Sequence, residues 1–135
     1  AADFLKYYPL PCELSFIKLA SYKGTQSTGQ VKEVIGLDQN PDKRVIVILE
    51  DIVDTGNTLE EIHRIFSNNH HQRLIIATLF FKPTAFRKNL PIEYAGFEIP
   101  NKFILGYGLD YDGLGRNLPD VYQLKDPSST DKSAK

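Results

Sequence analysis

The residues best suited to chemistry are two adjacent carboxylates, Glu50 and Asp51, and the small polar segment DTGNT at residues 54–58. A turn centred on Gly56 that leads into a helix leaves backbone N–H groups without partners inside the chain. Those groups and the positive end of the helix dipole favour a bound anion such as a phosphate. A phosphate held beside two carboxylates indicates a phosphorylated sugar, whose hydroxyl groups or metal ion the acids would engage.

This chemistry needs a strand before the acids and a helix after the turn. Residues 45–49 read VIVIL, which has the length and β-branching of a strand buried on both faces. Residues 59, 62, 65 and 66 are apolar at helical spacing, and TLEE at residues 58–61 fits a capping box. We therefore expect a helix from Thr58 to about residues 68–69, with the acids at the carboxyl end of the strand, where open α/β sheets bind ligands.

The rest of the chain predicts a helix over residues 2–8 and a hairpin with strands at 13–22 and 31–37 around a polar loop. It also predicts strands at 73–81, 93–99 and 103–107, a Gly-rich loop at 110–117, and a disordered polar tail at 126–135. Strands that alternate with helices predict one three-layer α/β domain over residues 1–125. Its sheet would be mainly parallel, with one antiparallel hairpin strand.

Bulk composition narrows the class of protein. A net charge of −1 gives no long-range attraction to nucleic acid or to an anionic membrane. Lone Cys12 excludes an internal disulfide and fits a reducing, cytoplasmic setting. No apolar run approaches the ~20 residues of a membrane helix. The chain begins Ala1-Ala2-Asp3 and has no methionine, so we expect an N-terminal segment to be absent from it.

Residues 50–58, EDIVDTGNT, closely resemble the 5-phosphoribosyl 1-pyrophosphate (PRPP) motif of the type I phosphoribosyltransferases. That motif is a hydrophobic strand, two acids, two apolar residues, then Asp-Thr-Gly and a small hydroxyl residue. FEIPNKFILGYGLDY at residues 97–111 and LFFKP at 79–83 resemble the C-terminal signature and the lysine-bearing strand end of the 6-oxopurine enzymes, the hypoxanthine-guanine phosphoribosyltransferases. LASY at 19–22 with QSTG at 26–29 resembles their active-site lid, which implies lid residues Ser21, Tyr22, Ser27 and Thr28.

The resemblance implies a purine salvage enzyme, a pentosyltransferase that moves the 5-phosphoribosyl group from PRPP to hypoxanthine or guanine and releases pyrophosphate. Glu50 and Asp51 would engage the ribose hydroxyls and, through them, a magnesium ion. Asp54 would serve as general base or acid at purine N7. The 5′-phosphate would be held largely by backbone N–H groups of Thr55, Gly56, Asn57 and Thr58. Many relatives carry a basic residue where this chain has Asn57.

The purine and pyrophosphate would be held by later residues. Lys82 would donate to the purine O6, which favours a 6-oxo over a 6-amino group because two donors cannot pair. Phe103 would stack on the purine and the Ile104 backbone would meet its edge, while Asp110 would lie in the purine site and help bind Mg²⁺. Arg116 would contact pyrophosphate. Alone, Lys82 could be a lysine extending from a strand end, Phe103 a core aromatic and Arg116 a surface arginine.

Some alternatives stay open at this point. A phosphoribosyltransferase-like regulator that senses nucleotides and binds RNA would need a basic face, and the sequence shows no basic cluster. A pyrimidine or 6-aminopurine enzyme is disfavoured by Lys82 and the Phe103 segment. Relatives have a further strand upstream, which family order would place between the strands at 14–21 and 45–49, and nothing here matches it. The resemblance also implies a homodimer or homotetramer, and the preferred purine is not fixed.

Overall fold

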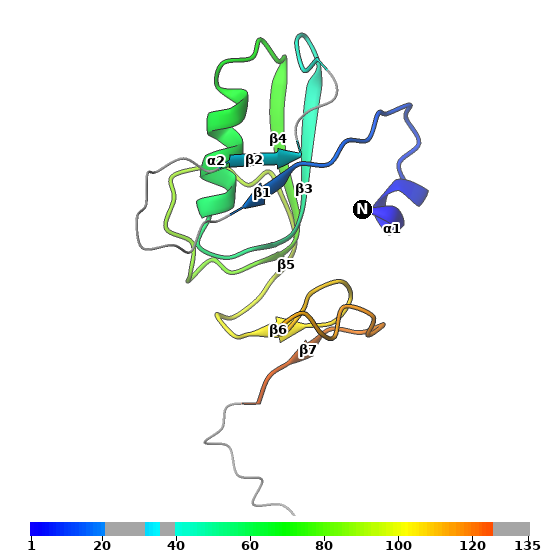
Figure 1. The fold of residues 1–135 in the computed structure, drawn as a ribbon, viewed down its shortest axis with the longest axis vertical. Coiled ribbons are helices and arrows are strands. Elements are labelled where there is room, and N and C mark those ends of the chain that lie inside the picture. Colours follow the sequence, from blue (N-terminus) through cyan, green and yellow to red (C-terminus); the bar gives the residue numbers. More distant parts are fainter. Residues whose placement is uncertain (21–31, 36–39, 126–135) are drawn as a thin grey trace, which may run out of the picture.

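The computed structural model describes residues 1–20, 32–35 and 40–125 of the chain. Its elements, in order, are α1 (Ala2–Lys6), β1 (Lys18–Ala20), β2 (Lys32–Ile35), β3 (Val45–Val53), α2 (Asn57–Phe66), β4 (Arg73–Phe81), β5 (Tyr94–Glu98), β6 (Ile104–Leu105) and β7 (Tyr122–Gln123). The strands β3, β4 and β5 form a parallel sheet, whereas β1–β2 and β6–β7 are separate antiparallel pairs (Figure 1). The predicted α/β class, with a mainly parallel sheet and an antiparallel hairpin, is confirmed.

The core lies between α2 and the sheet, which run side by side in Figure 1. The helix buries Leu59, Ile62 and Phe66, which recur at helical spacing, and they pack with Val53 and Ile76 of the sheet. Full burial of each such side chain contributes about 1.5–3 kcal/mol. We call β3, β4, β5 and α2 the body.

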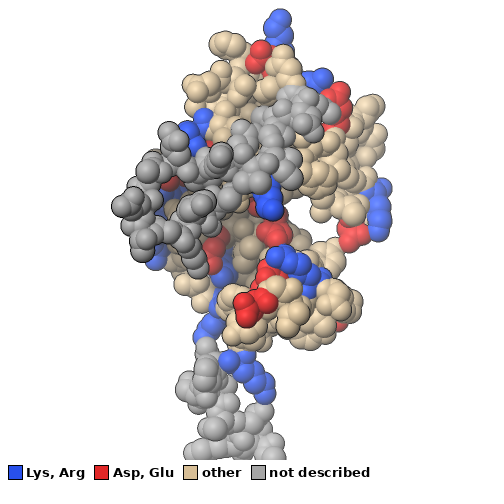
Figure 2. Space-filling view, in the orientation of Figure 1, with Lys and Arg blue, Asp and Glu red and all other residues tan. Residues whose placement is uncertain are grey.

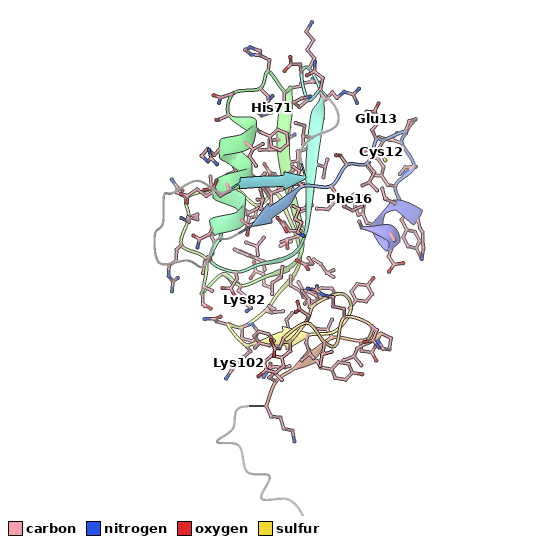
Figure 3. All side chains as sticks on the ribbon, viewed as in Figure 1. Cys12, Glu13, Phe16, His71, Lys82 and Lys102 are labelled. Carbon is pink, nitrogen blue, oxygen red and sulfur yellow. The ribbon has the colours of Figure 1, made fainter. Side chains whose placement is uncertain are left out.

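The opposite side of β3 departs from the expectation of a strand buried on both faces. β3 is the edge of its sheet, and Val45 and Val47 are 52% and 42% exposed. A groove of about 600 Å³ follows this edge, between β3 and N-terminal residues that include Cys12 and Glu13 (Figure 3). The groove is lined by residues from 14–17 and from 45–49, which belong to the two strands that were expected to flank a further strand.

A smaller unit, which we call the hood (residues 103–124), follows the body and lies near the carboxyl ends of its strands (Figure 1). The expected strand at 103–107 is only Ile104–Leu105, and its partner Tyr122–Gln123 was not expected. Between them the chain folds into tight turns, in which Gly106 pairs with Leu109 and Tyr111 with Leu114.

The remaining elements differ from expectation mainly in length. The first helix stops at Lys6 rather than at residue 8, and the first hairpin strand is limited to Lys18–Ala20. Across the described ranges, no helix is long and apolar enough to cross a membrane.

Candidate active site

The acid pair lies within β3 and not at its end, because the strand continues to Val53. Neighbouring side chains of a strand point to opposite faces, and the two carboxylates differ accordingly. Glu50 is partly buried and lines a cavity of about 90 Å³ together with residues 52–59. Asp51 is exposed, and its Oδ1 accepts a hydrogen bond from the Ile52 backbone N at 2.7 Å. The structure therefore brings Glu50, but not Asp51, into this cavity.

Glu50 carries the electrostatic perturbation of the site. Burial, with a smaller contribution from the charge of Asp51, raises the pKa of Glu50 to about 7. A carboxyl group with this pKa changes charge near neutral pH. Its ability to accept hydrogen bonds from hydroxyl groups of a ligand therefore increases as the pH rises through 7.

The turn at residues 54–58 has the shape of an anion-binding site, but the helix that follows it does not start at Thr58 as expected. The helix begins at Asn57 with Gly56 as its N-cap, so the predicted capping box at Thr58 is wrong. Gly56 has a left-handed backbone with φ of 87° and offers no side chain to cap the helix. The first N–H groups of α2 are consequently left for an external acceptor, at the positive end of the helix dipole.

Asp54 and Lys82 meet beside this turn. The Lys82 Nζ lies 2.8 Å from Asp54 Oδ2, although the residues are 28 positions apart. The parallel register explains the contact, because Val53 pairs with Phe81 and each functional residue follows its strand directly. Lys82 is only 6% exposed and its backbone N donates to Val53 O at 3.0 Å. It is thus a buried lysine with a fixed partner, and not one that extends into solvent.

Figure 3 separates this end of the sheet from the other. Lys82 lies at the end nearest the hood, whereas His71 lies at the opposite end, just before β4 begins. The His71 ring packs edge-on against Phe66, with centroids 6.2 Å apart.

The hood brings together the remaining predicted residues. Arg116 Nη2 lies 2.6 Å from Asp110 Oδ1, and its Nη1 donates to the Gly108 carbonyl at 2.8 Å. Phe103 is 48% exposed and packs edge-on against Tyr111 at 5.5 Å, so it is not a core aromatic. Ile104 is half-buried and pairs with Gln123 in the β6–β7 ladder. The surface is hollowed between body and hood, with acidic and basic side chains at its rim (Figure 2).

The carboxylates suit Mg²⁺ only in combination with a substrate. Among the residues that the structure describes, no three potential ligands form a cluster. Mg²⁺ is usually held by one or two carboxylates, with waters and substrate phosphates completing the octahedron. Glu50, Asp51 and Asp110 offer carboxylates of the kind that such an ion uses, but they do not form a complete site by themselves.

One segment near the site was not predicted from the sequence, and one predicted part of the site lies outside the described residues. Residues 86–88 pack behind the 54–58 turn, and no local sequence pattern predicts that contact because the segments are about 30 positions apart. The predicted lid residues Ser21, Tyr22, Ser27 and Thr28 lie outside the described residues, so they stay predictions.

A parallel sheet that ends in an anion-binding turn, a partly buried acid and a buried lysine fits a protein that binds a phosphorylated ligand. The family model of the phosphoribosyl transferase domain matches residues 3–112. A hypoxanthine-guanine phosphoribosyltransferase from Streptococcus pyogenes is 40% identical over 126 residues, 93% of this chain and 70% of that protein. The namesake from Streptococcus agalactiae is 39% identical over the same shares.

Solved structures agree with these sequences. A hypoxanthine phosphoribosyltransferase from Staphylococcus aureus has a TM-score of 0.84 and 36% identity, over 92% of this chain and 68% of that one. A hypoxanthine-guanine phosphoribosyltransferase from Bacillus anthracis has a TM-score of 0.84 and 35% identity, over 92% and 74%. The chain contains a phosphoribosyl transferase domain and belongs to the hypoxanthine-guanine phosphoribosyltransferase family. The family and fold predicted from the sequence are confirmed.

Proposed function

We propose that this protein transfers the 5-phosphoribosyl group of PRPP to hypoxanthine or guanine, forming inosine or guanosine 5′-monophosphate and pyrophosphate. The main structural support for the proposal is the grouping of three features of the site. The anion-binding turn, Glu50 and the Asp54–Lys82 pair all lie at one end of the parallel sheet. That grouping offers separate places for a phosphate, a ribose and a purine edge.

The Asp54–Lys82 pair is matched to the edge of a 6-oxopurine. Such a base presents O6 and N7 side by side on one edge. An ammonium donor and a carboxylate acceptor 2.8 Å apart can pair with O6 and with an N7 proton at the same time. Lys82 would then recognise the base, and Asp54 would take the N7 proton as N9 bonds to C1′. A 6-amino group at the same place would face Lys82 with a second donor.

The sugar and the leaving group would be held from two sides. Backbone N–H groups of Thr55, Gly56, Asn57 and Thr58 would bind the 5′-phosphate, while Glu50 and Asp51 would engage the ribose hydroxyls. Arg116 would neutralise charge that develops on pyrophosphate as the C1′–O bond breaks. Phe103 would stack on the purine and the Ile104 backbone would meet its edge.

Mg²⁺, when bound with PRPP, would supply further charge neutralisation at the leaving group. Glu50, Asp51 and Asp110 are the residues that would hold it. The lid residues 21–28 would exclude water from the oxocarbenium-like sugar, which solvent would otherwise hydrolyse. We also propose a cytoplasmic homodimer or homotetramer, a setting that suits a chain with one free cysteine.

The test is to supply the protein with PRPP, Mg²⁺ and hypoxanthine, guanine, xanthine, adenine or orotate, and to follow nucleotide and pyrophosphate formation. We expect turnover with 6-oxopurines and little with adenine or orotate. Absence of nucleotide with every base would reject the function. Turnover with adenine or orotate alone would instead favour the other base classes.

An RNA-binding regulator is the other reading, and no observation favours it. On the face in Figure 2, basic and acidic side chains of the described residues are interspersed and form no continuous basic patch. Tight, salt-dependent RNA binding without turnover would nevertheless support it.

A further inference from the structure

Residues 86–88 follow β4 and pack against the back of the 54–58 turn, and the proposed function gives them no role. The Arg87 backbone N donates to the Thr55 carbonyl at 3.1 Å. A Cβ added at Gly56 would lie 2.5 Å from Phe86 Cε2 and 2.8 Å from Lys88 Cγ. We infer that Phe86, the Arg87 backbone and Lys88 are positioning residues that hold this turn in the shape that binds the sugar's 5′-phosphate. The inference rests on the proposed function.

The backbone hydrogen bond sets the direction of a phosphate-binding N–H group. In a trans peptide the carbonyl of one residue and the N–H of the next point in opposite directions. Because Arg87 N binds the Thr55 carbonyl from behind, the Gly56 N–H points away from residues 86–88. The cavity beside the turn is lined by Glu50 and residues 52–59 and by none of residues 86–88.

The Phe86 ring fixes the shape of the turn. It lies against the Cα of Gly56 on the side where any other residue would carry its Cβ. The ring is itself held edge-on by Phe81 at the end of β4, with centroids 5.4 Å apart. The left-handed Gly56 therefore rests on an aromatic side chain anchored in the sheet, and a smaller side chain there would leave the turn unsupported.

Lys88 adds an electrostatic contribution. Glu60 lies in the first turn of α2, where its negative charge would oppose a bound phosphate. Lys88 Nζ pairs with Glu60 Oε2 at 2.6 Å, and the lysine side chain is 23% exposed. The segment DTGNT itself contains no cation. Lys88 thus offsets an acid that would otherwise weaken phosphate binding.

The same segment is fastened to the purine end of the site. Ala85 N and Phe86 N both donate to the Lys82 carbonyl, at 3.0 and 3.1 Å. Residues 82–88 thus run from the residue proposed to recognise the base to the back of the phosphate turn. Lys82 is thus the anchored end of the segment, and residues 86–88 are the part that contacts the phosphate turn.

The first experiment is Phe86→Ala, with Phe86→Leu as the conservative variant and Phe97→Ala as the matched control. Phe97 also packs against a sheet phenylalanine, Phe80 at 5.9 Å, but it lies on β5. We expect Phe86→Ala to raise the PRPP KM on the order of 10-fold, since small misplacements of binding groups cost this much or more. The hypoxanthine KM and kcat should change little, and the backbone amide of Arg87, which donates to the Thr55 carbonyl, should exchange hydrogen faster. Phe86→Leu should recover most of the loss, and Phe97→Ala should leave PRPP KM as in the parent.

Two results would overturn the inference. One is a PRPP KM in Phe86→Ala that stays within twofold of the parent. The other is an equal rise in both KM values, which would mean general loosening of the fold. Hydrogen exchange separates this inference from the function. A parent protein that forms no nucleotide defeats the proposed function, whereas unchanged exchange of the Arg87 amide in Phe86→Ala defeats the positioning role whatever the activity.

The second experiment tests Lys88 by a double-mutant cycle with Glu60. Lys88→Gln should raise the PRPP KM about threefold at low salt, because it exposes the acid. Lys88→Gln combined with Glu60→Gln should restore it, and high salt should reduce the difference. Arg64→Gln, which breaks the neighbouring Arg64–Glu61 pair of α2, is the control. Equal effects of the single and double variants would contradict the electrostatic role.

Discussion

The body and the hood hold their functional groups by different means. In the body, nine-residue strands β3 and β4 and the buried face of α2 fix Asp54, Lys82 and the 54–58 turn. In the hood, the strands have two residues each, and Leu109 is its one buried hydrophobic side chain among those the structure describes. Arg116 and Asp110 are instead placed by tight turns and by their own ion pair.

This difference assigns different tasks to the two regions. Packed strands allow little movement, which suits groups that must meet a reacting atom within tenths of an ångström. Turns held by polar contacts open at lower cost, which suits groups that receive and release a leaving group. Substitutions of functional side chains in the body should therefore affect stability and turnover together, whereas substitutions of functional side chains in the hood should affect binding and leave stability almost unchanged.

The largest expected effect is that of Asp54→Asn in the body. It should lower kcat by roughly 10²–10⁴-fold, because the variant loses the proposed general base. It should also cost about 1–3 kcal/mol of stability, because buried Lys82 would face a neutral amide. Steady-state kinetics and urea unfolding measure the two effects. A kcat within twofold of the parent would remove Asp54 from proton transfer.

Two glycines with left-handed backbones give the most direct comparison of the regions. Gly113→Ala in the hood meets no atom within 4 Å, so only backbone strain of about 1–2 kcal/mol is expected. Gly56→Ala in the body adds a collision with Phe86, which raises the expected loss to about 2–5 kcal/mol. Urea unfolding of both variants tests this. Equal losses would show that the body is no more tightly packed than the hood.

Glu50 should make stability depend on pH. Its folded-state pKa of about 7 lies above the ordinary 4.5, so the folded state favours the protonated carboxyl. That contribution is fully present below about pH 4.5 and is lost as the pH rises through 7. On this account the free energy of unfolding should fall by about 2–3 kcal/mol over that range.

Urea unfolding at several pH values tests this loss. It should vanish in Glu50→Gln and be reduced in Asp51→Asn, because the charge of Asp51 is the second cause of the shift. If the parent and Glu50→Gln show the same pH dependence, another group is responsible for it.

The smallest expected effect is that of Arg116→Lys in the hood. In the reverse reaction the pyrophosphate KM should rise about tenfold, the value of one charged hydrogen bond. The free energy of unfolding should change by less than about 0.5 kcal/mol, because the side chain is largely exposed. Arg64→Lys on α2 is the control. A stability loss above 1 kcal/mol would contradict the division between body and hood.

The sequence predicted the body well because its signals are local. β4 was expected at residues 73–81 and is found there, since a long apolar run ends at a Lys-Pro pair. The extension of β3 through Glu50 and Asp51 was missed because charged residues usually end an apolar strand. The helix start was misjudged because Thr58 resembles a cap, whereas the left-handed Gly56 takes that position.

The sequence predicted which residues belong to the site, but it did not predict the contacts between them. The sequence named Asp54 and Lys82 separately, but their ion pair depends on the β3–β4 register. Asp110 and Arg116 were assigned to different ligands, and only the turns of the hood bring them together. The position of Phe86 behind Gly56 depends on tertiary packing, which no local pattern encodes.

The hydrogen-bonded register of β3 and β4 sets the distance between two residues of the site. Pairing of Val53 with Phe81 places the next residue of each strand at the same level, so the spacing between the Asp54 carboxylate and the Lys82 ammonium group is set by the register of the two strands. An insertion or deletion of one residue in either strand would shift one group by about 3.3 Å relative to the other. A change in the length of either strand would therefore separate the two groups, even if it occurred at a position that never touches a substrate.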